Sequence, residues 1–108
     1  MRDSITTSGT QTYGEAAELM GNTTLAGTTV SFGSTLAGGS NSLAVTGNAV
    51  LGGAATGLNA VSVSGTTALN GGVVSSAGTQ SYAGAVTLGN NTTLTGSTVN
   101  FGSTLAGG

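Results

Sequence analysis

Two glutamates near the start of this 108-residue chain, Glu15 and Glu18, are the only side chains close enough together for acid–base catalysis. Glycosidases and lyases need clustered carboxylates or basic groups to act as general acid and base. The other charged residues are Arg2 and Asp3. An internal repeat, described below, lacks both carboxylates in its second copy, which favours an exposed surface pair over a catalytic one.

Other site chemistries lack their residues. The chain has no His and no Cys, which excludes the usual catalytic triads and zinc sites. A calcium-binding solenoid needs an aspartate in every turn, and Asp3 is the only one. The pairs Gly52-Gly53 and Gly71-Gly72 lack the lysine of a phosphate-binding loop and are interpreted as turns. The sequence therefore predicts a protein that is not an enzyme and that uses no metal or cofactor.

The composition is that of a folded but almost uncharged chain. Only 4% of the residues are charged, whereas about 25% is usual in soluble domains. The chain is 37% hydrophobic, which separates it from disordered proteins. A net charge of −2 argues against nucleic acid and anionic membranes as partners. No run of about 18 apolar residues is present, so membrane insertion is not expected. Long secreted bacterial surface proteins have such compositions more often than enzymes do.

The most informative feature is an internal repeat. Residues 9–39 recur as residues 78–108, with 21 identities in 31 positions, so that Gly9 corresponds to Gly78. A long period of this kind indicates stacked supersecondary units. We therefore divide the chain into a leader (1–8), a first repeat (9–77) and a second repeat that is cut short (78–108), and expect it to be a piece of a longer array.

Short alternating runs predict strands. Apolar and polar residues alternate between turn-forming Gly, Asn and Ser at residues 30–32, 43–45, 61–63, 86–88 and 99–101. Residues 14–20 have helical propensity, but their counterparts at 83–89 have the pattern of a strand. We therefore expect a strand over 16–20, with Ala17 and Leu19 inward and Glu18 outward.

The fold expected from this pattern is all-β: a right-handed parallel β-helix, or β-solenoid. Blocks recur at offsets of 18 and 25 residues, which suggests about three coils per 69-residue repeat, or about 23 residues per coil. Strands would pair in parallel with the next coil, aliphatic ladders inside and Thr, Ser and Asn ladders outside. Parallel crossovers are right-handed in most proteins. The alternative, a β-sandwich or barrel built from hairpins, does not account for the internal similarity.

One further pattern resembles a known family. Gln-x-Tyr-x-x-x-(Ala/Val)-x-Leu, followed by Asn-Thr-Thr-Leu-x-Gly-x-Thr-Val-x-Phe-Gly, occurs at residues 11–33 and 80–102. It is similar to the repeat arrays of filamentous-haemagglutinin-like exoproteins and large autotransporter adhesins of Gram-negative bacteria. The resemblance implies a secreted β-helix, exported across the outer membrane and projecting from the cell surface as a shaft in cell adhesion. The chain departs from the family in lacking its N-terminal secretion domain and C-terminal translocator.

Five residues are candidates for modification or binding. Asn22, Asn90 and Asn91 lie in sequons and are candidate glycosylation sites, or else ordinary turn residues. Tyr13 and Tyr82 hold equivalent positions in the two repeats and are candidates for a binding surface.

Other surface features have simpler interpretations. The equivalent pair Phe32 and Phe101 is expected in the core, because it continues an inward alternation with Val30 and Val99. An ice-binding face would need Thr-x-Thr on every coil, and the chain has this pattern only twice, at residues 10–12 and 93–95.

The sequence thus favours a structural solenoid shaft of a surface adhesin or exoprotein, without catalysis. Its partners would be neighbouring repeats of the parent chain. The alternative is a module that binds host or matrix glycan, or a neighbouring fibre, through the Thr/Asn-rich outer face. Exposed tyrosines at equivalent positions would favour the binding module, and buried tyrosines the shaft. A truncated solenoid has open strand edges, so end-to-end self-association is also expected.

Overall fold

The computed structural model describes residues 3–107 and contains 15 β-strands in this range. No helix in the described range is long and apolar enough to cross a membrane. Strands form because short alternating runs, rich in Val, Leu and Thr, are separated by Gly, Asn and Ser. The predicted all-β solenoid is confirmed, and all strand pairs are parallel.

The coil has three faces. The long strands β4 (Thr23–Phe32) and β6 (Leu43–Leu51) each run along the first face and continue on the second, so one ten-stranded sheet forms both faces. The first face also contains β1 (Asp3–Thr6), β8 (Val61–Val63), β11 (Thr79–Tyr82) and β14 (Thr98–Phe101). The second also contains β2 (Gln11–Tyr13), β9 (Thr67–Leu69), β12 (Val86–Leu88) and β15 (Leu105–Gly107). The third is a five-stranded sheet of β3 (Ala17–Glu18), β5 (Leu36–Ala37), β7 (Ala55–Leu58), β10 (Val73–Ser76) and β13 (Thr93–Thr95).

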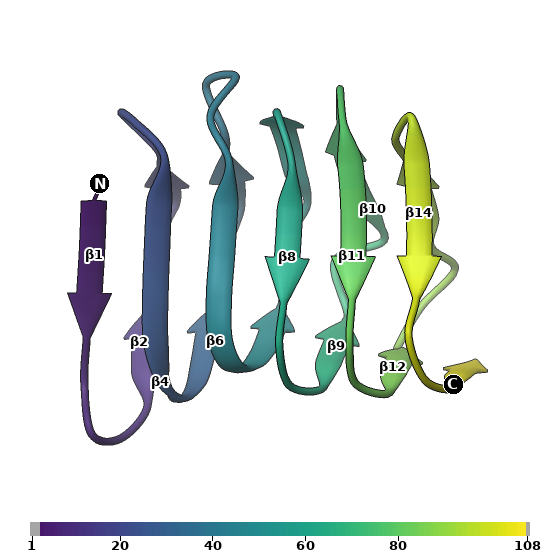
Figure 1. The fold of residues 1–108 in the computed structure, drawn as a ribbon, viewed down its shortest axis with the longest axis horizontal. Coiled ribbons are helices and arrows are strands. Elements are labelled where there is room, and N and C mark those ends of the chain that lie inside the picture. Colours follow the sequence, from purple (N-terminus) through teal and green to yellow (C-terminus); the bar gives the residue numbers. More distant parts are fainter. Residues whose placement is uncertain (1–2, 108) are drawn as a thin grey trace.

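The coil is right-handed, as the sequence predicts. In Figure 1 the near strands β8, β11 and β14 run downward, the more distant strands run upward, and the chain advances from left to right. The first strand, β1, lies in the first coil and pairs with β4 of the second coil. Residues 3–6 are therefore part of the solenoid, although the sequence analysis assigned them to a leader; residues 1 and 2 lie outside the described range.

Each coil is shorter than the sequence suggested. Along the first face, Ile5 pairs with Leu25 and Leu25 with Val45; along the third, Ala17 pairs with Leu36. Successive partners on all three faces are separated by about 19 residues, which is enough for three short strands and their turns. The coil length of about 23 residues expected from the sequence is therefore too long, and the 69-residue repeat contains between three and four coils. The offset of 18 marks a true coil, whereas the offset of 25 does not, because it aligns strands of different faces.

As a result, the two copies of the repeat occupy different faces. Gln11 pairs with Val30 on the second face, whereas its counterpart Gln80 pairs with Val99 on the first. The 69-residue repeat spans 11 strands when β4 and β6 are each counted as two, which is three coils and two further faces. The second copy is therefore turned by one face relative to the first.

Inward side chains form a continuous apolar core. The alternation predicted for residues 16–20 is confirmed in its burial: Leu19 is buried, Ala17 is partly buried and Glu18 is exposed, although the strand itself covers only Ala17–Glu18. The predicted inward positions of Phe32 and Val30 are also confirmed. The fully buried side chains come from all three faces, so the interior is filled along the whole axis.

One core residue is a buried hydroxyl with no partner. Thr67 is 2% exposed, and its Oγ1 makes no hydrogen bond. Thr67→Val keeps the shape and removes the unsatisfied group, so we expect it to raise the free energy of unfolding by about 1 kcal/mol. Thr23→Val is the matched control: this hydroxyl is also buried but donates to the Gly21 carbonyl at 3.0 Å, so its loss should destabilise. Thermal unfolding compares the two variants. Equal decreases in melting temperature for both would contradict the conclusion that the Thr67 hydroxyl is unsatisfied.

The corner between the first and second faces is closed by a glycine in every coil. A Cβ on Gly65 would lie 2.6 Å from the Gly47 carbonyl oxygen, and one on Gly84 would lie 2.5 Å from that of Gly65. A Cβ on Gly47 would overlap the carbonyl oxygen of Gly27, and Gly47 also has a φ of 119°. The coils can therefore approach to strand-pairing distance at this corner only where no side chain intervenes.

Candidate functional site

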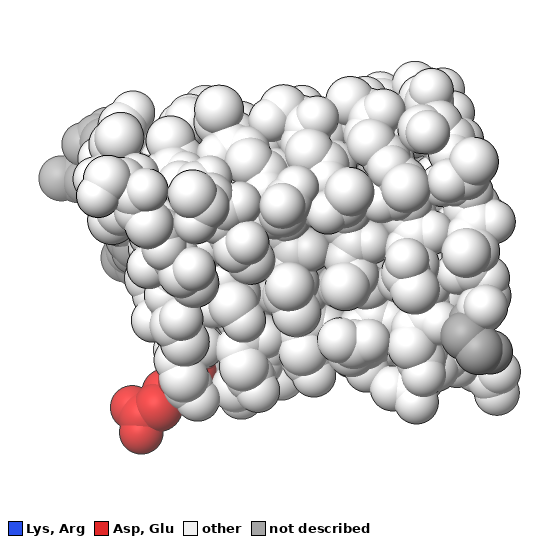
Figure 2. Space-filling model, turned by 90° about the horizontal axis from the view of Figure 1, so that it is seen from below, with Lys and Arg blue, Asp and Glu red and all other residues white. Residues whose placement is uncertain are grey.

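The predicted acidic pair lies at the surface. Glu15 and Glu18 are both exposed and border a surface hollow together with Tyr13, in the first coil. In the view of Figure 2 a red acidic group lies at the corner near the start of the chain. No cluster of three metal-ligating side chains occurs among the described residues. The pair has the exposed position expected of solvated surface carboxylates.

The side chains that the fold brings together are a glutamine and a tyrosine in each repeat. Gln80 is completely buried, and its Nε2 donates to the carbonyls of Val74 at 3.0 Å and Thr95 at 2.7 Å. The Tyr82 hydroxyl donates to Gln80 Oε1 at 2.7 Å. One glutamine therefore joins two strands of the third face, β10 and β13, to the tyrosine of the first face.

The first repeat contains the same arrangement on different faces. Gln11 Nε2 donates to the carbonyls of Ile5 at 3.0 Å and Ala26 at 2.7 Å, and the Tyr13 hydroxyl donates to Gln11 Oε1 at 2.8 Å. Since this copy is turned by one face, the glutamine here joins strands of the first face to a tyrosine of the second. We call each arrangement a Gln–Tyr module.

Each module is completed by a phenylalanine in the next coil. The rings of Tyr13 and Phe32 stack with centroids 5.2 Å apart, and those of Tyr82 and Phe101 with centroids 5.6 Å apart. Tyr82 is fully buried, whereas Tyr13, in the first coil, is partly exposed. The two tyrosines therefore do not form a repeated exposed patch, which was the pattern expected of a binding surface.

Burial changes the acidity of both phenols. Desolvation raises the pKa of Tyr82 strongly, and it raises the pKa of Tyr13 in the same direction. The folded chain thus holds these protons more tightly than the unfolded chain, in which tyrosine titrates near pH 10. Stability is fully present below that pH and is lost as the pH rises above it.

This linkage gives a pH prediction. Because the chain has no His and no Lys, its free energy of unfolding should be nearly constant between about pH 6 and 9. Above about pH 10 it should fall by up to about 1.4 kcal/mol per pH unit for each strongly shifted tyrosine. In urea titrations, the free energy of unfolding of the Tyr82→Phe variant should decrease much less above about pH 10 than that of the unmodified chain. A decline of the same steepness in that variant would contradict the role of Tyr82.

The three sequon asparagines lie in turns and differ in their contacts. Asn22 is exposed, and its Oδ1 accepts a hydrogen bond from the Ser42 amide at 3.0 Å. Asn90 is exposed, but its Nδ2, the atom that would carry a glycan, donates to the Asn70 carbonyl. Asn91 is exposed in the same turn. Asn22 and Asn91 are the more accessible of the three predicted acceptors, because the Nδ2 of Asn90 is already engaged.

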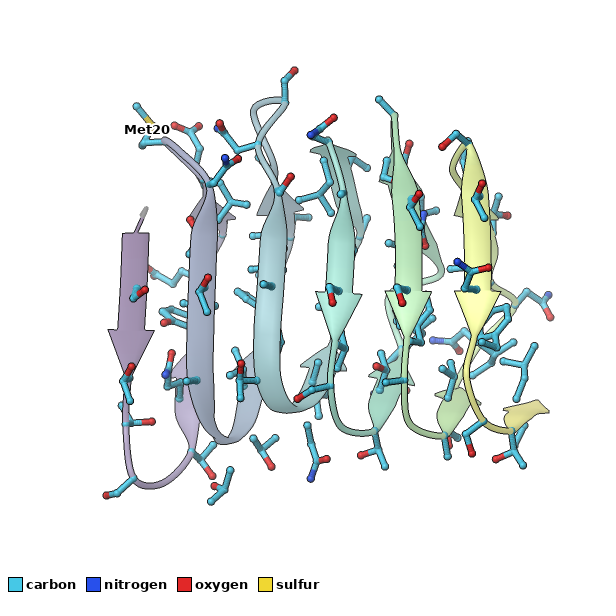
Figure 3. All side chains as sticks on the ribbon, in the orientation of Figure 1. Met20 is labelled. Carbon is cyan, nitrogen blue, oxygen red and sulfur yellow. The ribbon has the colours of Figure 1, made fainter. Side chains whose placement is uncertain are left out.

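The outer faces carry small, uncharged side chains. One rank on the first face consists of Ser4, Thr24, Ala44, Ser62, Ser81 and Asn100. A rank on the second consists of Thr12, Ser31, Val50, Ala68, Thr87 and Ala106. Met20 is the most exposed large hydrophobic residue of those described, at 66%, and it projects from the turn between β3 and β4 (Figure 3).

Sequence reasoning missed the role of the glutamines. It recognised that Gln11 and Gln80 recur, but a polar residue at an inward position looks like any other residue of a turn-rich chain. The available signal was spacing: the pair Gln11 and Tyr13 is followed by Phe32, and the pair Gln80 and Tyr82 by Phe101. The interval from tyrosine to phenylalanine equals one coil, and it is the interval at which the rings stack.

Comparison with known proteins adds no relative: no protein-family model, no curated protein and no solved structure matches this chain.

Proposed function

We propose that this chain is a structural shaft segment of a secreted bacterial surface adhesin or exoprotein, without catalysis of its own. In this role, ladders of parallel backbone hydrogen bonds hold the coils together and hold a binding region of the parent protein away from the cell. Neighbouring solenoid repeats of the parent chain would continue the same ladders at either end.

The observation that supports this proposal best is the separation of large and small side chains. The large side chains of the core point inward, and Gln80 and Tyr82 of the second repeat are completely buried. The outer ranks are Ser, Thr, Ala, Val and Asn, and between Leu19 and Gly107 the only ionisable side chain is the buried Tyr82. Over residues 19–107 such a surface stays hydrated without charge and presents no cluster of charged side chains.

The alternative function is a glycan- or fibre-binding module that uses the Thr- and Asn-rich outer face. It is favoured by the long hydroxyl and amide rank on the first face, because sugars are bound through such groups. It is disfavoured by the absence of an exposed aromatic ring in that rank, since aromatic faces usually supply much of the apolar contact with a ligand.

The proposal can be tested on the cells that produce the protein. Antibodies raised against the folded chain should label intact cells, and brief protease treatment of those cells should remove the label. Labelling only after the cells are broken would contradict a surface shaft. A glycan array probed with the purified chain distinguishes the two functions: the shaft predicts no saturable binding, whereas specific binding that is lost on substitution of Asn100 would favour the module.

A further inference from the structure

The two ends of the described solenoid expose strand edges of complementary shape. At one end lie β1, β2 and β3, whose inward residues Ile5, Tyr13 and Ala17 are only partly buried. At the other lie β13, β14 and β15, with Leu94 and Phe101 partly buried. Leu105, in β15, is 49% exposed. These residues continue the inward pattern of the core and are only partly covered at the two edges of the described solenoid.

At each end of the solenoid the three outermost strands lie at different heights along the axis, because the chain advances continuously as it coils. The first three strands occupy the first, second and third faces in that order, and the last three occupy the third, first and second. If a second copy followed without rotation, β1 would lie over β14 and β2 over β15, but one layer over β13 would stay empty. If it were turned by one face, β1 would lie over β13, β2 over β14 and β3 over β15, with no layer missing.

The internal repeat provides the side-chain register for this rotated arrangement. Ile5 is equivalent to Val74, and Val74 already pairs with Leu94. By the same register, the Tyr13 ring of a second copy lies over Phe101. Since Tyr82 stacks on Phe101 and Tyr13 on Phe32, the junction would make one column of four aromatic rings.

Charge does not oppose this contact. The acidic residues Glu15 and Glu18 lie at the first end, and the strands β13 to β15 contain no ionisable side chain. Edges in natural sheet proteins are commonly protected by charged residues or proline, and the second end has neither.

We propose that two copies of this chain stack head to tail, turned by one face, so that β1, β2 and β3 of one copy continue the sheets of β13, β14 and β15 of the other. The contact joins two different surfaces, so it leaves a free end on each side and extends into filaments. This stacking concerns the 108-residue chain itself, in which no further repeat covers β1 to β3 or β13 to β15.

Cysteine pairs test the register directly, because the chain has no cysteine of its own. Thr12 and Asn100 are outward and exposed, and the rotated stack places them on adjacent strands, about 4.8 Å apart and within disulfide range. A mixture of the single variants Thr12→Cys and Asn100→Cys should therefore form a mixed disulfide under mild oxidation. The unrotated stack instead places Ser4 beside Asn100. Cross-linking of Ser4→Cys with Asn100→Cys in preference to the first pair, or of neither pair, would overturn the proposal.

A charge at the edge tests the contact without depending on oxidation. Leu105→Lys changes a half-exposed edge residue, and Ser62→Lys adds the same charge on the outer rank in the middle of the solenoid. Sedimentation should show concentration-dependent assembly for the unmodified chain and for Ser62→Lys, and an assembly constant lowered about tenfold or more for Leu105→Lys. Circular dichroism establishes that both variants keep the strand spectrum. A monomeric unmodified chain, or equal assembly of both variants, would overturn the proposal.

Discussion

Gly47→Ala is expected to prevent stable folding. The added Cβ would overlap the carbonyl oxygen of Gly27 in the preceding coil, and this oxygen is backbone and cannot rotate away. Gly47 also has a φ of 119°, a conformation that alanine rarely adopts. Since β4 and β6 form the most extensive pairing among the described strands, separating them at this corner disrupts both faces. We expect a loss of about 4 kcal/mol or more, a large part of the stability of a small domain.

The matched control is Gly14→Ala, in the turn between β2 and β3. A Cβ at Gly14 would have no heavy atom within 4 Å, and Gly14 does not have a positive φ. This substitution should change the free energy of unfolding by no more than about 0.5 kcal/mol. Urea unfolding followed by circular dichroism compares the two variants. Equal stability of both would mean that the coils do not approach at the glycine corner.

The second large effect is expected from Gln80→Leu. Leucine fills the buried space but leaves the carbonyls of Val74 and Thr95 and the hydroxyl of Tyr82 without the partner that Gln80 provides. A buried polar group that loses its partner costs about 1–3 kcal/mol, so the variant should lose about 3–5 kcal/mol.

Gln11→Leu provides an internal comparison, because it removes the same three hydrogen bonds. In this copy the contacts are only partly buried, and Tyr13 is partly exposed in the first coil. Water can replace the lost bonds there, so we expect a loss of only about 1–2 kcal/mol. Denaturant titrations of both variants would contradict the Gln–Tyr module if Gln80→Leu were no more destabilising than Gln11→Leu.

The architecture could be predicted from the sequence because it depends on local alternation. Runs such as Val61-Ser62-Val63 can bury only one side of a strand, and strands with frequent glycines between them and a long internal repeat favour a parallel coil over hairpins. The inward position of Leu19 followed from the same alternation, even though the residue types of its segment favour a helix.

The coil length could not be predicted in the same way, because a repeat need not contain a whole number of coils. Equivalent positions such as Gln11 and Gln80 would occupy the same face only if the repeat closed on a complete coil. The Gln–Tyr module instead requires only a preceding face whose carbonyls it can join and a phenylalanine one coil further on. It therefore works equally well on the second face and on the first.

Every coil adds one strand to each of the three faces, and spin-label distances along the first face test this arrangement most directly. Ser4 and Asn100 lie on the same outward rank, five strand pairings apart, and Thr24 lies four pairings from Asn100. With labels on cysteines at these positions, and with unlabelled protein added to dilute contacts between molecules, the two pairs should give narrow distance distributions near about 24 Å and about 19 Å. Distances that do not decrease by one strand spacing between the two pairs, or broad distributions for both, would contradict the account.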